Sequence, residues 1–192
     1  MAETLERPLA PVRHRLDVGA YYRMAEAGIL TDRHRVELID GDVIDMAAIG
    51  SPHAAVTNRL LRAFARAVAE GSTLMSVQNP LRLDAYNEPQ PDVMLLRPSA
   101  DDYRASHPTA TDVLLLVEVS ETSLAYDRAT KVPLYARFEI PEVWIVDLVS
   151  AAVEIYREPK DGAYVRRERL AHGPLSPALV SGVTIEVSGL LA

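Results

Sequence analysis

The segment Val113-Leu-Leu-Leu-Val-Glu-Val119 constrains the fold of this 192-residue chain more than any other. It is short, β-prone and apolar at every position except Glu118. A strand with one solvated face alternates apolar and polar residues, whereas a continuous apolar run is typical of a strand covered on both faces. The segment therefore predicts a central strand in a sheet with helices on both sides, which indicates an α/β fold.

The rest of the chain supplies helices and further strands for such a sheet. Helices are predicted behind the N-cap Asp17 as far as Gly28, from Ser51-Pro52 to about Gly71, and within 122–138, where Pro133 must lie in the first turn. Asp40-Gly41, between two apolar runs, predicts a β-hairpin over 35–46. Further strands are predicted over 74–78, 80–83, 92–96, 142–148, 153–157, 164–170 and 183–187, with a hairpin turn at 159–162. We expect a loose arm over 1–15 and a single domain over 16–192, with mixed strand order.

Composition and short motifs exclude several classes of function. The absence of cysteine excludes disulfides, zinc–thiolate sites and thiol nucleophiles. The net charge of −7 argues against a protein that holds nucleic acid by bulk charge, but it permits a nuclease, because a metal site needs carboxylates. The chain has no Gly-rich phosphate loop, no Gly-x-Ser-x-Gly elbow and no His-Glu-x-x-His motif. No stretch approaches the roughly 18 apolar residues of a membrane helix, and the start resembles no secretory signal, so we expect a cytoplasmic protein without membrane contact.

Three carboxylates stand at positions where a charge is unexpected. Glu118 lies inside the most apolar run, Asp92 opens the strand after Pro91, and Glu37 lies on a partly apolar face of the first hairpin. Each has a simple alternative interpretation: an exposed strand end for Glu118, a turn cap for Asp92 and an edge-strand charge for Glu37. Burying a lone carboxylate costs several kcal/mol unless it is paired, protonated or bound to metal. Together, three acids at strand starts and ends are typical of a site for a hard cation such as Mg²⁺ or Mn²⁺.

Lysine usage gives an independent indication. The chain has 18 arginines and only two lysines, Lys131 and Lys160. Lys160 lies in a predicted hairpin turn, whereas Lys131 opens the helix that follows the Glu118 strand. Arginine cannot replace an ammonium that must fit beside a metal-bound water, so Lys131 is a candidate site residue, although a solvated helix lysine is the alternative. His53, near the start of the second helix, is more simply interpreted as a half-buried structural histidine.

These residues, in this order, resemble the PD-(D/E)XK nuclease superfamily. Within it, the chain is similar to the Uma-two family of restriction endonucleases, and the resemblance covers most of 16–192. The segments that carry it are Val36-Glu-Leu-Ile-Asp-Gly41, Ser51-Pro-His53, Gln90-Pro-Asp-Val93, Val117-Glu-Val-Ser120, Lys131-Val-Pro-Leu-Tyr135 and Ile140-Pro-Glu-Val-Trp-Ile-Val-Asp147.

Two positions depart from the family pattern. The superfamily usually has lysine two residues after the glutamate, where this chain has Ser120, so the resemblance implies that Lys131 has taken that role. The family also tends to have glycine before Ile-Pro-Glu, where this chain has Glu139.

The resemblance implies a restriction-endonuclease-like core, in which a mixed sheet is flanked by helices, with an N-terminal helix and β-hairpin. It implies an endonuclease that hydrolyses phosphodiester bonds, in DNA, with Mg²⁺ or Mn²⁺ as cofactor. Asp92, Glu118 and the carbonyl of Val119 would hold the metal, Lys131 would orient the attacking water or offset developing charge, and Glu37 would complete the site through water or a second ion. A homodimer would suit the cutting of two strands. The alternatives are a catalytically inactive module of this fold that binds DNA or a protein partner, and a nuclease for RNA or for branched or damaged DNA.

Overall fold

The computed structural model describes residues 12–31 and 33–192, and in this part of the chain six strands form one mixed sheet. Their order across the sheet is β3-β4-β5-β6-β7-β8, and all pairs are antiparallel except β5–β6. The strands are β3 (Leu74–Val77), β4 (Val93–Leu96), β5 (Val113–Ser120), β6 (Glu142–Asp147), β7 (Ala152–Lys160) and β8 (Ala163–Leu170). The predicted α/β class with mixed strand order is confirmed.

Strand β5 is covered on both faces, as its apolar sequence predicts. All eight of its residues are buried, and a 3₁₀ turn, η1 (Ala110–Asp112), leads into it. On one face Leu115 and Val117 pack with Trp144 under helix α2 (Ser51–Ala69). On the other face Leu116 packs with Tyr135, against the helical crossover. Because side chains alternate along a strand, Glu118 lies on the same face as Leu116 and points toward the crossover.

The parallel β5–β6 pair requires a crossover, which is helical. It consists of α3 (Leu124–Tyr126), the π-helical turn η2 (Asp127–Lys131) and α4 (Val132–Arg137). Pro133 lies in the first turn of α4, as expected, although the helical backbone continues through η2 on its N-terminal side. Glu139 follows the end of α4 with φ of 57°, a left-handed conformation that glycine adopts more readily, at the position where the resembled family tends to have glycine.

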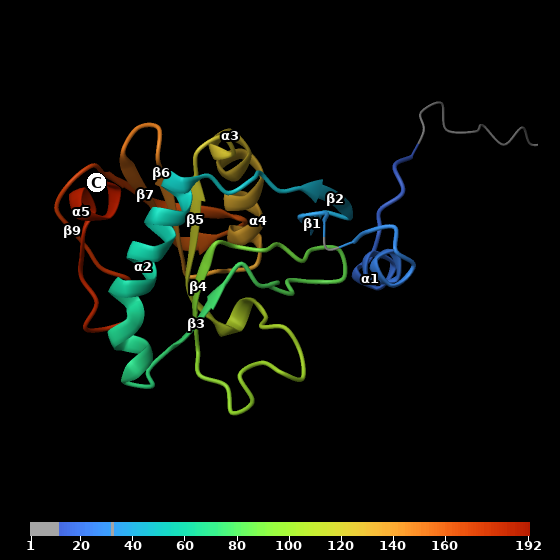
Figure 1. Cartoon of the computed structure of the whole chain (residues 1–192), viewed down its shortest axis with the longest axis horizontal. Coiled ribbons are helices and arrows are strands. Elements are labelled where there is room, and N and C mark those ends of the chain that lie inside the picture. Colours follow the sequence, from blue (N-terminus) through green and yellow to red (C-terminus); the bar gives the residue numbers. More distant parts are fainter. Residues whose placement is uncertain (1–11, 32) are drawn as a thin grey trace, which may run out of the picture.

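The predicted N-terminal helix and hairpin are both present, beside the main sheet (Figure 1). Helix α1 (Val18–Glu26) begins at Asp17, whose side chain accepts a hydrogen bond from the Ala20 N–H at 2.6 Å. Strands β1 (Val36–Ile39) and β2 (Asp42–Asp45) pair through Asp40-Gly41, and both turn residues have positive φ, as a type I′ turn requires. Strand β1 also bridges to Glu88 of the 78–90 loop. This contact brings the hairpin close to the start of β4.

The C-terminal segment packs against helix α2. It contains β9 (Pro174–Leu175) paired with β10 (Ile185–Glu186), followed by α5 (Val187–Leu191). Arg59 of α2 donates to the carbonyl of Leu190 at 3.1 Å, so this arginine is committed to a structural contact. No helix in the described part of the chain is long and apolar enough to cross a membrane.

Some predicted boundaries were wrong. Residues 80–83 form no strand: the N–H groups of Leu81, Arg82 and Leu83 donate to loop carbonyls, and of these residues only Arg82 forms an isolated bridge, with Thr109. The last strand is limited to 185–186 because Val187 already begins α5. The N-cap of α2 is Gly50 rather than Ser51, and the turn at 159–162 narrows to Asp161-Gly162. The expected arm over 1–15 lies mostly outside the described residues, so it and the single-domain boundary at 16–192 remain predictions.

Candidate active site

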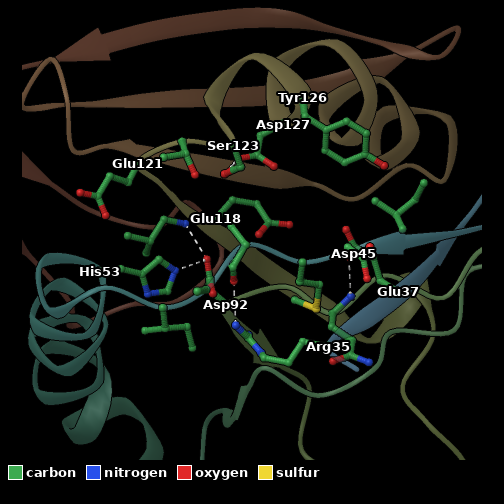
Figure 2. Close-up of a pocket in the computed structure, with 18 of the residues that line it drawn as sticks. Arg35, Glu37, Asp45, His53, Asp92, Glu118, Glu121, Ser123, Tyr126 and Asp127 are labelled. Carbon is green, nitrogen blue, oxygen red and sulfur yellow. Dashed lines mark hydrogen bonds and ion pairs between the residues drawn. The ribbon is translucent and has the colours of Figure 1, made fainter. Parts of the chain in front are cut away.

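The predicted site residues lie together in one pocket of about 550 Å³. The pocket is bounded by the β1–β2 hairpin, the start of α2, the ends of β4 and β5, and the crossover helix (Figure 2). All five residues predicted from the sequence line it: Glu37, Asp92, Glu118, Val119 and Lys131. Three carboxylates that are far apart in the sequence are thus neighbours in space, and each is at least nine-tenths buried.

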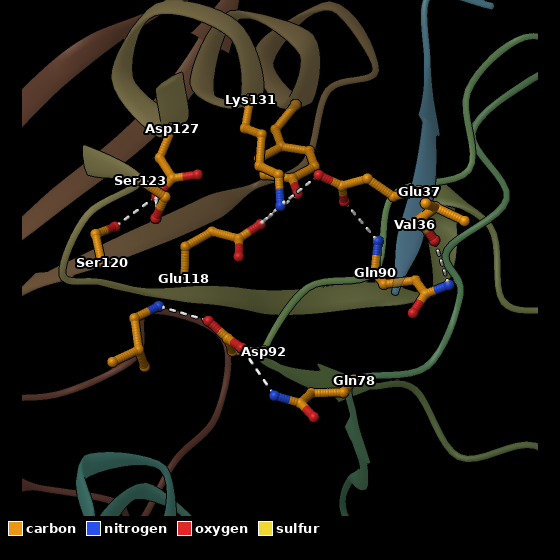
Figure 3. Close-up of polar contacts among 12 residues, drawn as sticks. Val36, Glu37, Gln78, Gln90, Asp92, Glu118, Ser120, Ser123, Asp127 and Lys131 are labelled. Atoms are coloured by element: carbon orange, nitrogen blue, oxygen red, sulfur yellow. Dashed lines mark hydrogen bonds and ion pairs between the residues drawn. The ribbon is translucent and has the colours of Figure 1, made fainter. Parts of the chain in front are cut away.

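Lys131 lies between two of these carboxylates (Figure 3). Its Nζ is 3.0 Å from Oε1 of Glu37 and 3.3 Å from Oε1 of Glu118. The lysine is itself 6% exposed, so it is not the solvated helix lysine of the alternative interpretation. Figure 3 also shows Glu37 held from below by Gln90, whose N–H donates to Oε2 at 3.1 Å. The ammonium therefore joins the hairpin to the central sheet.

The crossover helix reaches Glu118 with a second side chain, that of Tyr135. Its hydroxyl donates to Oε1 of Glu118 at 2.6 Å. Tyr135 lies four residues after Lys131, so the two side chains share one helix face. Tyr135 was not predicted from the sequence, although a polar aromatic residue at this spacing from a candidate lysine is a signal that could have identified it.

Burial and charge have opposite effects on the Glu118–Lys131 pair. Burial raises the pKa of Glu118 to about 8, and Lys131 only partly offsets it. Burial alone would lower the pKa of Lys131, but the negative charges of Glu118 and Glu37 outweigh it, so its pKa is raised. Lys131 is thus held as an ammonium and is no candidate for a general base. Desolvation is therefore the main cause of the raised pKa of Glu118, and Lys131, which also contacts Glu37, offsets it only in part.

Asp92 is ionised and held by three donors. Its Oδ2 accepts from the Val119 N–H at 2.9 Å and lies 3.0 Å from His53 Nε2, while Oδ1 accepts from Gln78 at 3.1 Å. Burial opposes ionisation, but the contacts with His53, Val119 and Gln78 outweigh it and lower the pKa of Asp92. Nδ1 of His53 is buried without a partner among the described residues, so the tautomer that fits carries its proton on Nε2 and donates to Asp92. The histidine is half-buried, as expected, but it also belongs to the site.

The oxygens of Asp92 and Glu118 that can still accept a bond are the ones that could hold a cation. Asp92 Oδ1 retains one lone pair beside its bond from Gln78, and Glu118 Oε2 accepts no hydrogen bond from the described residues. Within 12–31 and 33–192, no three His, Asp or Glu side chains converge closely enough to hold an ion alone. A metal here would therefore need further oxygen ligands besides these carboxylates, such as water or the Val119 carbonyl that the resemblance implies. This donor set fits Mg²⁺ or Mn²⁺, which prefer oxygen ligands and retain several waters.

A fourth buried acid of the site, Asp127, was also not predicted from the sequence. Its Oδ2 accepts from the hydroxyls of Ser120 and Ser123, both at 2.6 Å. Ser120 is the residue at the position where the superfamily usually has lysine, and it fastens the crossover helix to the end of β5. This contact fixes the helix that carries Lys131, so the ammonium reaches the site from the helix rather than from the strand.

Comparisons with known proteins agree with this architecture. The family model Uma2, described as "Putative restriction endonuclease", matches residues 18–188. A solved structure from Anabaena variabilis ATCC 29413, described as a putative nuclease belonging to DUF820, is similar to this chain with a TM-score of 0.69 at 11% sequence identity. The similarity covers 92% of this chain and 97% of that one, and at this identity it shows the fold alone. A comparison with curated protein sequences gave no match.

Proposed function

The chain belongs to the Uma2 family of putative restriction endonucleases, and from this premise we propose that it is a Mg²⁺- or Mn²⁺-dependent endonuclease that hydrolyses phosphodiester bonds in DNA. The observation that carries the proposal is the buried ammonium of Lys131 between Glu37 and Glu118, beside the ionised Asp92. Removing three acids and a lysine from water is costly, so this arrangement is not expected from the needs of folding alone. Strongly perturbed ionisable groups that converge in a pocket are typical of catalytic sites.

The roles follow from the atoms that remain available. Asp92 Oδ1, Glu118 Oε2 and the carbonyl of Val119 would hold the metal. When bound, the metal would lower the pKa of a water and offset charge on the phosphoryl oxygens. Lys131, fixed as an ammonium, would orient the attacking water and offset the charge that develops as the P–O bond breaks. Glu37 would hold that ammonium in place and contact the metal through water.

Cleavage assays test the proposal directly. We expect the protein to cut plasmid or oligonucleotide DNA with Mn²⁺ or Mg²⁺, to stop in excess chelator, and to lose cleavage in Asp92→Asn prepared identically. Equal cleavage by the parent and the variant would place the activity elsewhere. No cleavage by the parent would favour the alternative function, a nuclease-fold module that binds without cutting. A homodimer, expected for cutting two strands, is tested by light scattering of the same samples.

Metal binding should be visible without any substrate. A ligand that binds only the folded state stabilises it by about 2.7 kcal/mol at a concentration 100-fold above Kd. For a chain of this length we expect the melting temperature to rise by roughly 5–11 °C with saturating Mn²⁺. Asp92→Ala should abolish the rise, whereas Glu26→Ala, which removes an exposed carboxylate at the end of α1, should retain it. A rise of the same size in Asp92→Ala would contradict the assigned metal ligands.

His53 should affect metal affinity through Asp92. Residues that orient metal-binding carboxylates typically contribute about 10–100-fold to metal affinity or activity. We therefore expect His53→Ala to raise the Kd for Mn²⁺ by a factor in that range, measured by titration calorimetry. His53→Gln retains an N–H donor and should lose less. An unchanged Kd in His53→Ala would mean that the contact with Asp92 has no effect on the metal.

A further inference from the structure

The pocket has an apolar wall that metal-assisted hydrolysis does not require. The chain between β2 and α2 contributes Ile44, Met46 and Ile49, and Tyr126 of α3 faces the pocket from the crossover helix. Ile44, Met46 and Tyr126 are half-buried, while Ile49 is 43% exposed. Figure 2 shows Tyr126 on the crossover helix, with its ring on the side of the hairpin. The pocket therefore combines acidic groups with apolar surface.

The charges around the pocket do not suit a duplex held by its phosphates. Proteins that grip duplex DNA neutralise several phosphates with lysine and arginine. Among the described residues, two cations, Arg35 and Lys131, line the pocket, and Lys131 is already paired. Six acidic side chains of the same part of the chain line it as well: Glu37, Asp45, Asp92, Glu118, Glu121 and Asp127. Affinity for a substrate at this site would therefore depend on contacts with a base more than on contacts with a run of phosphates.

The size of the pocket indicates a single small group. Its volume of about 550 Å³ falls in the range of roughly 300–1,000 Å³ that is usual for sites of small molecules and cofactors. A paired base inside a duplex is stacked on both sides and cannot enter such a pocket unless it leaves the stack, at a cost of a few kcal/mol. An unpaired base enters without that cost.

We propose that the pocket accepts one unpaired nucleotide, so that the substrate of this enzyme is single-stranded nucleic acid. The base would lie against Met46, Ile49 and the ring of Tyr126, and its phosphodiester would lie over Asp92 and Glu118. Stacking of a base on an aromatic side chain is worth about 1–3 kcal/mol and depends little on the base. This inference rests on the proposed nuclease function and names its substrate class. A wall of this composition would hold any base, so cleavage should depend little on sequence.

The test compares three substrates of one sequence: single-stranded DNA, single-stranded RNA and blunt duplex DNA, each end-labelled. We expect the parent with Mn²⁺ to cut a single strand at least about 10-fold faster than the duplex. The reason is that a paired base in the duplex cannot make the stacking contact with the pocket wall. Comparing the two single strands shows whether the 2′-hydroxyl of RNA is accepted. Much faster cleavage of either single-stranded DNA or single-stranded RNA than of duplex DNA supports the inference. Binding is measured in parallel by fluorescence anisotropy, using Glu118→Gln to prevent cleavage.

Variants of the apolar wall connect the preference to the pocket. Tyr126→Ala and Met46→Ala should reduce cleavage of the single strand and so remove most of its advantage over duplex. Tyr126→Phe should keep the preference, because the hydroxyl that it removes is buried without a partner among the described residues. Ile29→Ala, at an exposed residue that does not line the pocket, should also keep it.

The outcomes separate this inference from the proposed function. Equal or faster cleavage of duplex would overturn the inference and leave the nuclease in place. If the parent binds a single strand in preference to duplex but never cuts it, the proposed nuclease function is contradicted. The preference of the pocket for an unpaired nucleotide is then supported. A preference that survives in Tyr126→Ala and Met46→Ala would place the selectivity outside this wall and overturn the inference.

Discussion

Glu118→Gln should abolish metal-dependent cleavage and yet leave the protein at least as stable as the parent at pH 8. The change removes one of the two carboxylates proposed to hold the metal. Stabilisation of the transition state by a metal is worth several kcal/mol, and each 1.36 kcal/mol is a factor of ten in rate. We therefore expect the rate of cleavage to fall by at least about 100-fold. The amide oxygen of the substituted side chain can still accept the hydrogen bond from Tyr135, so the packing around β5 should be preserved.

The stability of Glu118→Gln relative to the parent should depend on pH, and the raised pKa of Glu118 determines the direction. Burial raises the pKa of Glu118 from its ordinary value of 4.5 to about 8. A group whose folded-state pKa is raised contributes stability below its ordinary pKa and loses it as pH rises through the folded-state value. The difference in free energy of unfolding between parent and Glu118→Gln should therefore shift in favour of the variant between pH 4.5 and about 8.

Denaturant titrations of both proteins at several pH values, without added metal, measure this difference. Taking the difference cancels the titration of groups that the two proteins share. A constant difference across pH 4.5 to about 8 would show that Glu118 is not desolvated as described. Retention of cleavage by Glu118→Gln would instead contradict the proposed site. The two failures are distinguishable because one concerns the folded protein and the other concerns its reaction.

Lys131→Met should be the most destabilising single change at the site and should also eliminate cleavage. It leaves Glu37 and Glu118, which are 2% and 4% exposed, without a cation. Removing one partner of a buried ion pair typically costs about 3–5 kcal/mol. For a chain of this length that corresponds to a fall in melting temperature of roughly 6–20 °C. Cleavage should be lost because no other ammonium in the described part of the chain faces the carboxylates.

Two controls make this prediction specific. Lys160→Met changes the other lysine, which is exposed beside the β7–β8 turn, and should alter stability by no more than about 0.5 kcal/mol. The double variant Lys131→Met/Glu37→Gln removes a charge of each sign and should recover much of the lost stability without recovering cleavage. If Lys131→Met melts with the parent, the ammonium does not balance buried charge, and the electrostatic description of the site is wrong.

Much of the architecture could be predicted because local patterns and burial agree. The apolar run of β5 identified the central strand, and Asp40-Gly41 set the register that places Glu37 opposite Ile44. The scarcity of lysine selected Lys131, and the structure places it between two of the three predicted carboxylates. These predictions depended on burial costs and turn geometry, which act over a few residues and are visible in a sequence.

The unpredicted parts depend on contacts between distant segments. Tyr135 and Asp127 contact the site only because the crossover helix packs on one face of β5. His53 reaches Asp92 because α2 starts beside the start of β4. The family resemblance includes this histidine, but its position in a helix does not reveal the contact. Segment 80–83 has strand-like composition, but its N–H groups donate to loop carbonyls, at Asn87, Pro89 and Pro108, and not to a neighbouring strand. Pairings of this kind are determined by tertiary structure.

The π-helical turn at 127–131 also affects which insertions and deletions the gene could tolerate. A π turn contains one residue more than an α-helical turn, and such turns occur frequently at functional sites. Deletion of one exposed residue, such as Ala129, would remove the extra residue of this turn. The same deletion would rotate Lys131 by about 100° relative to Asp127. Asp127 could then remain tied to Ser120, or Lys131 could reach Glu118, but not both. Descendants of this chain that are shortened here should therefore lose one of the two contacts and with it the cleavage that we propose, so the length of this helix is a more informative trait for sorting them than overall sequence identity.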